Sequence, residues 1–275
     1  MTPSAAGADS GRGRGGVVVG VRGVLFDVDG TLFDYAEAEA AGLRAHLGAE
    51  PVAGVGSAGE ALVRWRELMA EEYGRFLAGE VGFAEQQRAR VRRFLGRPGL
   101  SDEEASAWFG RYAVRRDLAG AAFADAEPVL RRLAADHRLG VVSNAGAEGQ
   151  RHKLAAVGLL PYLRGAFVCC DEYGAAKPAA GIFHAGCAAL GLPPGQVAYV
   201  GDDYTADALG ARDAGLRSYW LCRGEQRPGA AGPASGVHVL RTLHALPAAL
   251  AALAAPADPH PRRGEKGAIR GRGSG

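Results

Sequence analysis

The chain has 275 residues, of which 48% are hydrophobic and 23% are charged, and its formal net charge is +2. This length and composition predict a globular protein with one large domain, or one domain that carries an insertion. The near-neutral charge gives no reason to expect a nucleic-acid partner, and no apolar run approaches the roughly 18 residues of a membrane helix.

The two ends of the chain are expected to be disordered tails. Residues 1–16 are rich in Gly, Ser and Arg and lack the apolar segment of a secretory signal, which favours a cytoplasmic protein. Residues 254–275 carry five basic side chains against two acidic ones, as expected of a solvated basic tail. The cysteines lack metal-ligand spacing and are expected to be reduced, packed thiols: Cys169, Cys170, Cys187 and Cys222.

The first predicted strand lies within Val17–Asp27 and ends in two aspartates. Val24, Leu25 and Phe26 form a continuous apolar run, as in a strand buried on both faces of a parallel sheet. A buried strand would not tolerate unpaired carboxylates, so Asp27 and Asp29 are expected at its carboxyl end. Ligands bind at that edge of open α/β sheets. Taken alone, the run is better explained as an ordinary Asp-Gly turn, and the segments that follow along the chain reverse this preference.

Residues 34–123 have a helical pattern with no convincing strand. Apolar residues between Leu62 and Phe76 recur at three- and four-residue steps, and Ser101–Glu104 is a capping box. We therefore predict a helical-bundle domain inserted after the first strand. Core packing accounts for its aromatic side chains better than substrate contact does.

From residue 124 the pattern alternates between helices and short apolar runs. A helix is expected over 125–136, and five further strands are expected at 139–142, 166–169, 197–200, 218–222 and 237–240. This alternation predicts an α/β fold with a doubly wound parallel sheet, whose core domain comprises residues 17–33 and 124–253. Polar residues follow three of the strands, and their carboxyl ends should converge at one edge. They are Asp27 and Asp29, Ser143 and Asn144, and Asp202 and Asp203.

Four short segments in this order resemble the motifs of phosphatases in the haloacid dehalogenase superfamily. They are Phe26–Leu32, Val142–Asn144, Lys177–Pro178 and Gly201–Asp207. The helical insertion resembles the type-1 cap of that superfamily's subfamily I, and is loosely similar to caps of pyrimidine 5′-nucleotidase-like members. The resemblance covers about residues 20–224 and implies a Rossmannoid core with a helical cap.

The resemblance implies a phosphatase reaction with an aspartyl-phosphate intermediate. Asp27 would be the nucleophile, since a carboxylate with an ordinary pKa of about 3.9 is ionised at neutral pH and needs no base. Asp29 would protonate the leaving oxygen and then activate water. For this it must hold a proton near neutrality, and crowding of carboxylates would raise its pKa.

The resemblance also implies a Mg²⁺ ion, because several acids alone would repel a phosphate dianion. Its expected ligands are the side chains of Asp27 and Asp202 and the backbone carbonyl of Asp29. Lys177 would neutralise the nucleophile and the phosphate oxygens. Ser143 and Asn144 would bind a phosphoryl oxygen; alternatively, Ser143 is an ordinary helix cap.

Thr31, Asp203 and Asp207 are candidates for supporting positions around the metal. The family often has Ser where this chain has Asp203, and Asn where it has Ala206. Asp203 either orients metal-bound water or caps the following helix. Asp207 lies in the first turn of that helix, where the helix dipole favours an acid in any case.

The expected substrate is a small phosphomonoester, with a nucleoside monophosphate as the leading candidate. Four cap residues could contact it or belong to a solvated face: Arg64, Arg66, Tyr73 and Arg88. Alternative functions are a β-phosphoglucomutase-like phosphotransferase, a 2-haloacid dehalogenase and a catalytically idle binding protein. We expect no nucleic-acid or membrane partner, and a monomer or weak homodimer.

Overall fold

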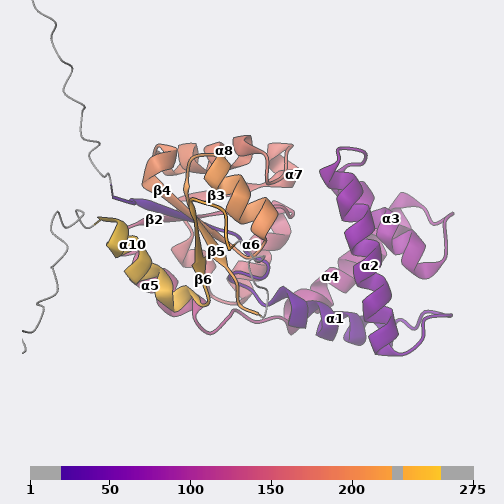
Figure 1. Ribbon diagram of the computed structural model, residues 1–275. Helices are drawn as coiled ribbons and strands as arrows, with labels where there is room; N and C mark the ends of the chain where they lie inside the picture. The colour runs from indigo at the N-terminus through magenta and orange to yellow at the C-terminus, as the bar shows by residue number, and fades with distance from the viewer. Residues whose placement is uncertain (1–19, 225–231, 255–275) are drawn as a thin grey trace, which may run out of the picture.

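The computed structural model describes residues 20–224 and 232–254 (Figure 1). The predicted tails lie outside these residues, except for residue 254, which is the last residue of a helix. All strand pairs are parallel and form one sheet in the order β3-β2-β1-β4-β5-β6. The strands are β1 (Gly23–Phe26), β2 (Arg138–Ser143), β3 (Ala166–Cys169), β4 (Val197–Gly201), β5 (Arg217–Leu221) and β6 (Val237–Leu240). The predicted doubly wound α/β fold is confirmed.

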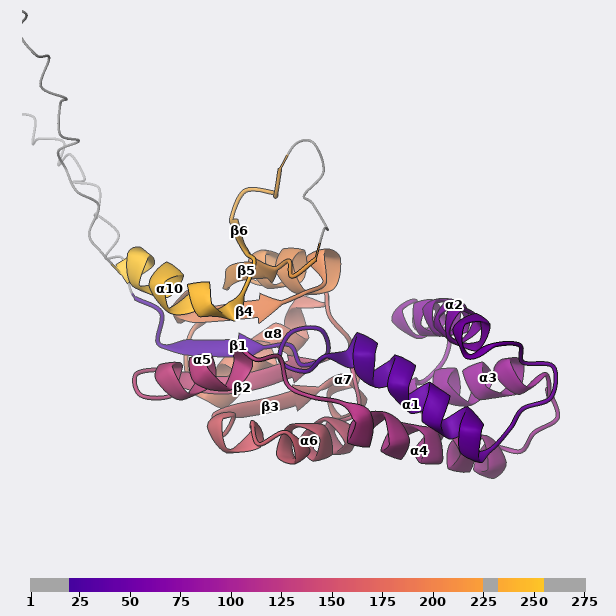
Figure 2. The ribbon, with the colours of Figure 1, turned by 90° about the horizontal axis from the view of Figure 1, so that it is seen from below.

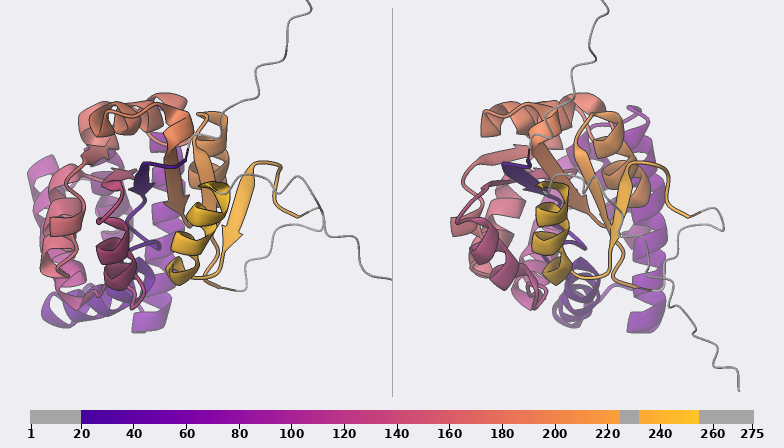
Figure 3. Two further views of the ribbon diagram at one scale, coloured as in Figure 1. Left: turned by 90° about the vertical axis from the view of Figure 1, so that its left-hand side faces the viewer. Right: turned by 60° about the vertical axis from the view of Figure 1, so that its left-hand side comes forward.

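Helices lie on both sides of the sheet (Figure 3). Val24 and Phe26 of β1 pack in a core with α5 (Ala126–Leu133), α6 (Ala147–Ala156) and α10 (Leu246–Ala254). Leu25 faces the opposite core, which contains α8 (Ala180–Leu190) and α9 (Gly210–Asp213). Because β1 is covered on both faces, every one of its side chains must be apolar or absent, which explains the uninterrupted apolar run.

The first strand, Gly23–Phe26, lies within the predicted segment, of which residues 17–19 are outside the description. One local prediction needs correction. The helix expected after Gly201 begins as a π-helix, Tyr204–Leu209, before α9. The remaining short elements are α7 (Cys170–Tyr173) and single turns at Leu160–Tyr162, Pro194–Gln196 and Leu243–Ala245.

The helical insertion stands at the end of the sheet toward which the strands point (Figure 2). It consists of α1 (Tyr35–Ala49), α2 (Ala58–Leu77), α3 (Phe83–Leu95) and α4 (Asp102–Ala119), all within the predicted 34–123 segment. Its core is aromatic, and the Trp65 indole N–H donates to the Tyr112 hydroxyl at 3.2 Å. We refer to α1–α4 as the cap.

The two chain segments that join the cap to the sheet run side by side. Asp34 N donates to Ala121 O, and Phe123 N donates to Leu32 O, both at 3.0 Å. Since the first connection follows β1 and the second lies beside it, the cap is held directly over the residues that follow this strand.

Within the described residues no helix is both long and apolar enough to cross a membrane. All four cysteines are buried, as expected of packed thiols. The predicted cytoplasmic location stays a prediction.

Gly42 allows α1 and α4 to approach closely, and we predict that Gly42→Ala destabilises the protein. A methyl group at this position would lie 2.3 Å from Arg116 Cα, an overlap that only separation of the helices relieves. The expected loss in free energy of unfolding is about 1–3 kcal/mol, measured by urea denaturation. Gly48→Ala in the same helix is the control, because nothing lies within 4 Å of its added methyl group. Equal effects of the two changes would contradict the tight-contact explanation.

His46 makes the stability of the cap depend on pH. Burial, together with the Arg115 and Arg111 charges and against the opposing effect of Glu50, lowers the pKa of His46 from 6.5 to about 4. Its Nδ1 lies 2.8 Å from a guanidinium N–H of Arg115, so the ring accepts this bond only when Nδ1 carries no proton.

The unfolded chain therefore binds more protons than the folded chain between about pH 4 and 6.5, and stability must fall as pH falls through this window. This group alone should account for a loss of about 3 kcal/mol between pH 7 and pH 4. Urea denaturation at both pH values should show a smaller loss in His46→Gln than in the wild type. An unchanged pH dependence in the variant would exclude His46 as the source.

Candidate active site

The polar residues predicted at the ends of three strands meet in one cavity of about 630 Å³ between the sheet and the cap. Asp27 follows β1, Ser143 ends β2 and Asp202 follows β4; β2 and β4 are the two neighbours of β1. The cavity is lined by every predicted site residue except Thr31. Its cap side is formed in part by Tyr73, Gln86, Arg90, Phe109 and Arg116.

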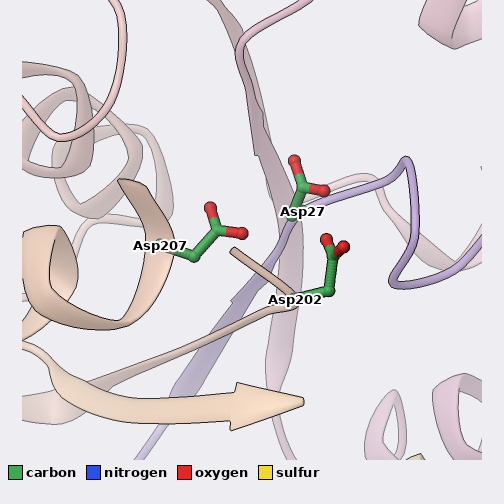
Figure 4. Close-up of side chains that lie close together, drawn as sticks. All are labelled: Asp27, Asp202 and Asp207. Carbon is green, nitrogen blue, oxygen red and sulfur yellow. The ribbon is translucent and has the colours of Figure 1, made fainter. Parts of the chain in front are cut away.

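Three carboxylates cluster at the sheet edge (Figure 4). One oxygen from each of Asp27, Asp202 and Asp207 lies within 4.8 Å of the other two. The sequence predicted that Asp27 and Asp202 come together, and it placed Asp207 in a supporting position. All three side chains point into the same small volume.

Lys177 sits at the centre of the hydrogen bonds around this cluster. Its ammonium, only 3% exposed, donates to Asp27 Oδ1 at 2.7 Å and to Asp207 Oδ1 at 2.6 Å. It also donates to the Tyr199 hydroxyl at 2.8 Å. With all three of its N–H groups used, the ammonium is fixed in place against Asp27.

Asp207 and Tyr199 orient Lys177. Asp207 Oδ2 accepts from the Asp203 backbone N–H at 3.0 Å, so both oxygens of Asp207 are engaged. The Tyr199 hydroxyl lies 2.9 Å from Asp207 Oδ1 and 3.0 Å from Val142 O, and it donates its single proton to one of them. Asp207 therefore holds Lys177 in place, and Asp27 and Asp202 are the carboxylates better placed to bind a metal ion.

The cluster carries more negative charge than Lys177 balances. Burial raises the pKa of Asp27 well above its ordinary value, Lys177 opposes this, and the charges of Asp207, Asp202 and Asp29 raise the pKa further. Burial and the Asp207 charge raise the pKa of Asp202 to about 7. Among the described residues, none donates a hydrogen bond to Asp27 Oδ2, and the one side chain that donates to Asp202 is Thr31. Hard oxygen donors with an excess of negative charge suit Mg²⁺.

Gly30 and Thr31 shape the surroundings of Asp202. Gly30 has φ +86°, and a Cβ there would lie 2.3 Å from Asp202 Oδ2. Glycine is therefore required both for the turn and for the space that the carboxylate occupies. The Thr31 hydroxyl donates to Asp202 Oδ1 at 3.3 Å, which places Thr31 in the predicted supporting position.

Asp29 is held as a carboxylate, contrary to the expectation that crowding would keep it protonated. Lys153 Nζ donates to Oδ1 at 2.5 Å, and the Gln150 amide donates to Oδ2 at 2.8 Å. Burial raises the pKa of Asp29, but the Lys153 and Arg116 charges and these hydrogen bonds outweigh burial and leave the pKa below its ordinary value. The correction arises because Asp29 faces cations, whereas Asp27 and Asp202 face other acids.

The side chains of Ser143 and Asn144 have different hydrogen-bond partners. Ser143 is not a helix cap, since Gly146 precedes α6, and its hydroxyl accepts from the Gln150 amide at 3.0 Å. Asn144 uses its amide on the main chain of Lys177: Lys177 N donates to Oδ1 at 2.6 Å, and Nδ2 donates to Lys177 O at 2.9 Å. Asn144 thereby positions the lysine, and both ends of its side-chain amide are engaged.

Asp203 caps the helix that follows it. Its Oδ1 accepts from the backbone N–H groups of Thr205 at 2.8 Å and Ala206 at 2.7 Å. Of the two roles considered for this residue, capping is the one that these contacts provide.

Of the four cap residues considered for substrate contact, only Tyr73 lines the cavity. Its hydroxyl donates to Asn144 O at 3.2 Å. Arg64, Arg66 and Arg88 instead bond to cap partners, namely Arg93 O, Glu39 and Glu85.

Sequence reasoning missed Gln150, Lys153 and Tyr199, as well as the cap residues Arg90 and Arg116. A usable signal existed for Gln150 and Lys153, because their spacing of three puts them on one face of the helix that directly follows Ser143 and Asn144. Tyr199 gave no such signal, because it lies within an apolar run that forms a strand.

The chain is similar to a family of hydrolases and to individual phosphatases. The family model of haloacid dehalogenase-like hydrolases matches residues 21–215. The chain is 35% identical over 86 residues to phosphoserine phosphatase of Thermus thermophilus, covering 31% of this chain and 34% of the relative. It is 32% identical over 120 residues to N-acylneuraminate-9-phosphatase of Mus musculus, covering 43% of this chain and 48% of the relative. These matches span about a third to a half of each relative's length.

Solved structures share the fold over nearly the whole molecule. The putative hydrolase YfnB of Bacillus subtilis, solved with bound magnesium, has a TM-score of 0.71 at 21% identity, covering 85% of this chain and all of YfnB. Structures of 2-haloacid dehalogenases share the fold as well. The family model matches residues 21–215, which hold strands β1–β4, the cap and the acidic cluster, and the chain therefore belongs to the haloacid dehalogenase-like hydrolase family.

Proposed function

We propose that this hydrolase is a Mg²⁺-dependent phosphatase that acts on a small phosphomonoester through a phosphorylated Asp27. The observation that carries the proposal is the placement of Asp27. Its Oδ1 is fixed by Lys177, its Oδ2 accepts no hydrogen bond from the described residues, and Asp27 lines the cavity. Asp29, two residues later, lines the same cavity.

Asp27 would attack phosphorus with a carboxylate oxygen, form an acyl phosphate and release the alcohol. Lys177 holds the nucleophile and places a positive charge beside the phosphoryl oxygens, where negative charge must be offset. The Ser143 hydroxyl and the Asn144 backbone would contact one of those oxygens. Mg²⁺, held by the Asp27 and Asp202 side chains and the Asp29 carbonyl oxygen, would keep the acids ionised and offset the charge of the phosphate.

Asp29 would move protons in both halves of the reaction. Its carboxylate form, which Lys153 and Gln150 stabilise, is the form that takes a proton from water when the acyl phosphate is hydrolysed. The first half needs the protonated form to release the alcohol. Asp29 must therefore separate from the Lys153 ammonium before it can take up that proton.

The alternative functions fit the cluster less well. A dehalogenase attacks carbon and needs no metal ion, so it gives no reason to gather three carboxylates within 4.8 Å of one another. An idle binding protein would not need Lys177 fixed on the nucleophile. A β-phosphoglucomutase-like phosphotransferase shares both aspartates and is separated by assay with sugar phosphates. The names of the curated relatives support phosphatase activity.

Some expectations from the sequence stay predictions. They are the nucleoside monophosphate substrate, the monomeric or weakly dimeric state, and the lack of nucleic-acid and membrane partners.

The purified protein should hydrolyse p-nitrophenyl phosphate in the presence of Mg²⁺. Chelation by EDTA should abolish the activity, and added Mg²⁺ should restore it. Asp27→Asn removes the nucleophile and Asp29→Ala removes the acid–base group, so each should lower kcat by about 100-fold or more.

Asp213→Asn is the matched control, because Asp213 pairs with Arg212 on the surface away from the cavity. It should leave kcat unchanged. Activity that survives both EDTA and Asp27→Asn would reject the proposal, and metal-independent release of halide from 2-chloropropionate would favour the dehalogenase.

A further inference from the structure

Arg90 in the cap is a buried cation without a partner. The side chain is 3% exposed and lines the cavity. Its guanidinium forms no hydrogen bond or ion pair with any residue in the described ranges, and its Nε is buried and unsatisfied. The guanidinium lies over the rings of Trp65, at 4.2 Å, and Phe109, at 5.2 Å. These ring contacts orient it but leave its N–H groups unused.

Within the described residues no ion pair neutralises Arg90. Burial lowers the pKa of Arg90, and Glu39, whose charge acts to raise it, forms no ion pair with it. Glu39 instead binds Arg66, through Oε2 at 2.7 Å, while its Oε1 has no partner. Because a buried charge is costly without a counter-charge, the cap side of the cavity lacks an anion at Arg90.

Arg116 adds a second positive group on the same side. It comes from α4, lines the cavity and bonds to the adjacent Asp117 at 2.8 Å. Arg116, Arg90 and Asp29 all line the same cavity. Gln86, one turn before Arg90 on α3, also lines the cavity and has a buried, unsatisfied Oε1.

We propose that Arg90, supported by Arg116, binds a second anionic group on the leaving-group part of the substrate. This rests on the proposed phosphatase function and narrows its substrate class to phosphomonoesters that also carry a carboxylate or a second phosphate. A planar guanidinium binds either group through paired N–H donors. A cavity of about 630 Å³ has room for a small metabolite that spans both sides. A nucleoside monophosphate has no second anionic group and is a poorer fit.

The experiment compares substrates that differ in one anionic group. The first pair is 3-phosphoglycerate against glycerol 3-phosphate, and the second is fructose 1,6-bisphosphate against fructose 6-phosphate. We expect kcat/KM to be at least about tenfold higher for the more anionic member of one pair. A preference in the first pair indicates a site for a carboxylate, and a preference in the second pair indicates a site for a phosphate.

Arg90→Gln should remove that preference: kcat/KM falls about tenfold or more for the more anionic substrate and less than threefold for its partner. Arg90→Lys keeps the charge and should retain part of the preference. Arg93→Gln, on the same helix but ion-paired with Glu71 and Glu72, is the control and should change neither value. Thermal melting shows whether each variant is folded.

Loss of activity on both members of a pair to the same extent, in a folded variant, would show that Arg90 only supports the cap and would overturn the proposal. So would a wild type that hydrolyses phosphomonoesters without preference in either pair. If none of these compounds is hydrolysed, calorimetry measures how tightly each member of the same pairs binds, and this tests the anion site directly. Tighter binding of the more anionic member, lost in Arg90→Gln, would uphold the anion site while rejecting the phosphatase, and equal binding would reject both.

Discussion

The site depends on the contact between the Lys177 ammonium and the carboxylates around it. Burying Asp27, Asp202 and Asp207 together is unfavourable, because each charge raises the cost of the next. Lys177 offsets part of this cost, and Asp207 and Tyr199 consume its remaining N–H groups so that it faces Asp27 in a single orientation. The rest of the molecule can be understood as the scaffold that holds this ammonium and these acids at one point.

The parallel sheet brings these groups together from distant parts of the chain. β1 lies between β2 and β4, so residues that follow the three strands meet although more than 170 positions separate Asp27 from Asp202. The cap is attached through the segment that follows β1 and the segment that returns from α4, and the two are joined by the hydrogen bond from Asp34 N to Ala121 O. The same strand therefore leads to Asp27 and positions the cap over the cavity.

Residues of the site could be predicted from sequence where their position follows from the strand pattern alone. Asp27, Ser143 and Asp202 stand at the ends of apolar runs, and parallel topology then places them together. The protonation of Asp29 could not be predicted, because it depends on whether cations or acids surround the carboxylate, and Lys153 reaches it from a helix more than 120 positions away. Arg90 escaped notice for a similar reason: which face of α3 borders the cavity depends on how the cap packs against the sheet.

The two sides of the cavity carry opposite imbalances of charge. At the sheet edge Asp27, Asp202 and Asp207 outnumber Lys177, which calls for a cation. Across the cavity, Arg90 forms no ion pair with any acid in the part of the chain that the structure describes, which calls for an anion. A protein selected for stability alone would pair such groups internally, because unpaired buried charge is costly. Both imbalances border the same cavity, where a substrate with its metal ion would supply the missing charges. On this argument the sheet edge determines the reaction, and the cap determines which molecule undergoes it.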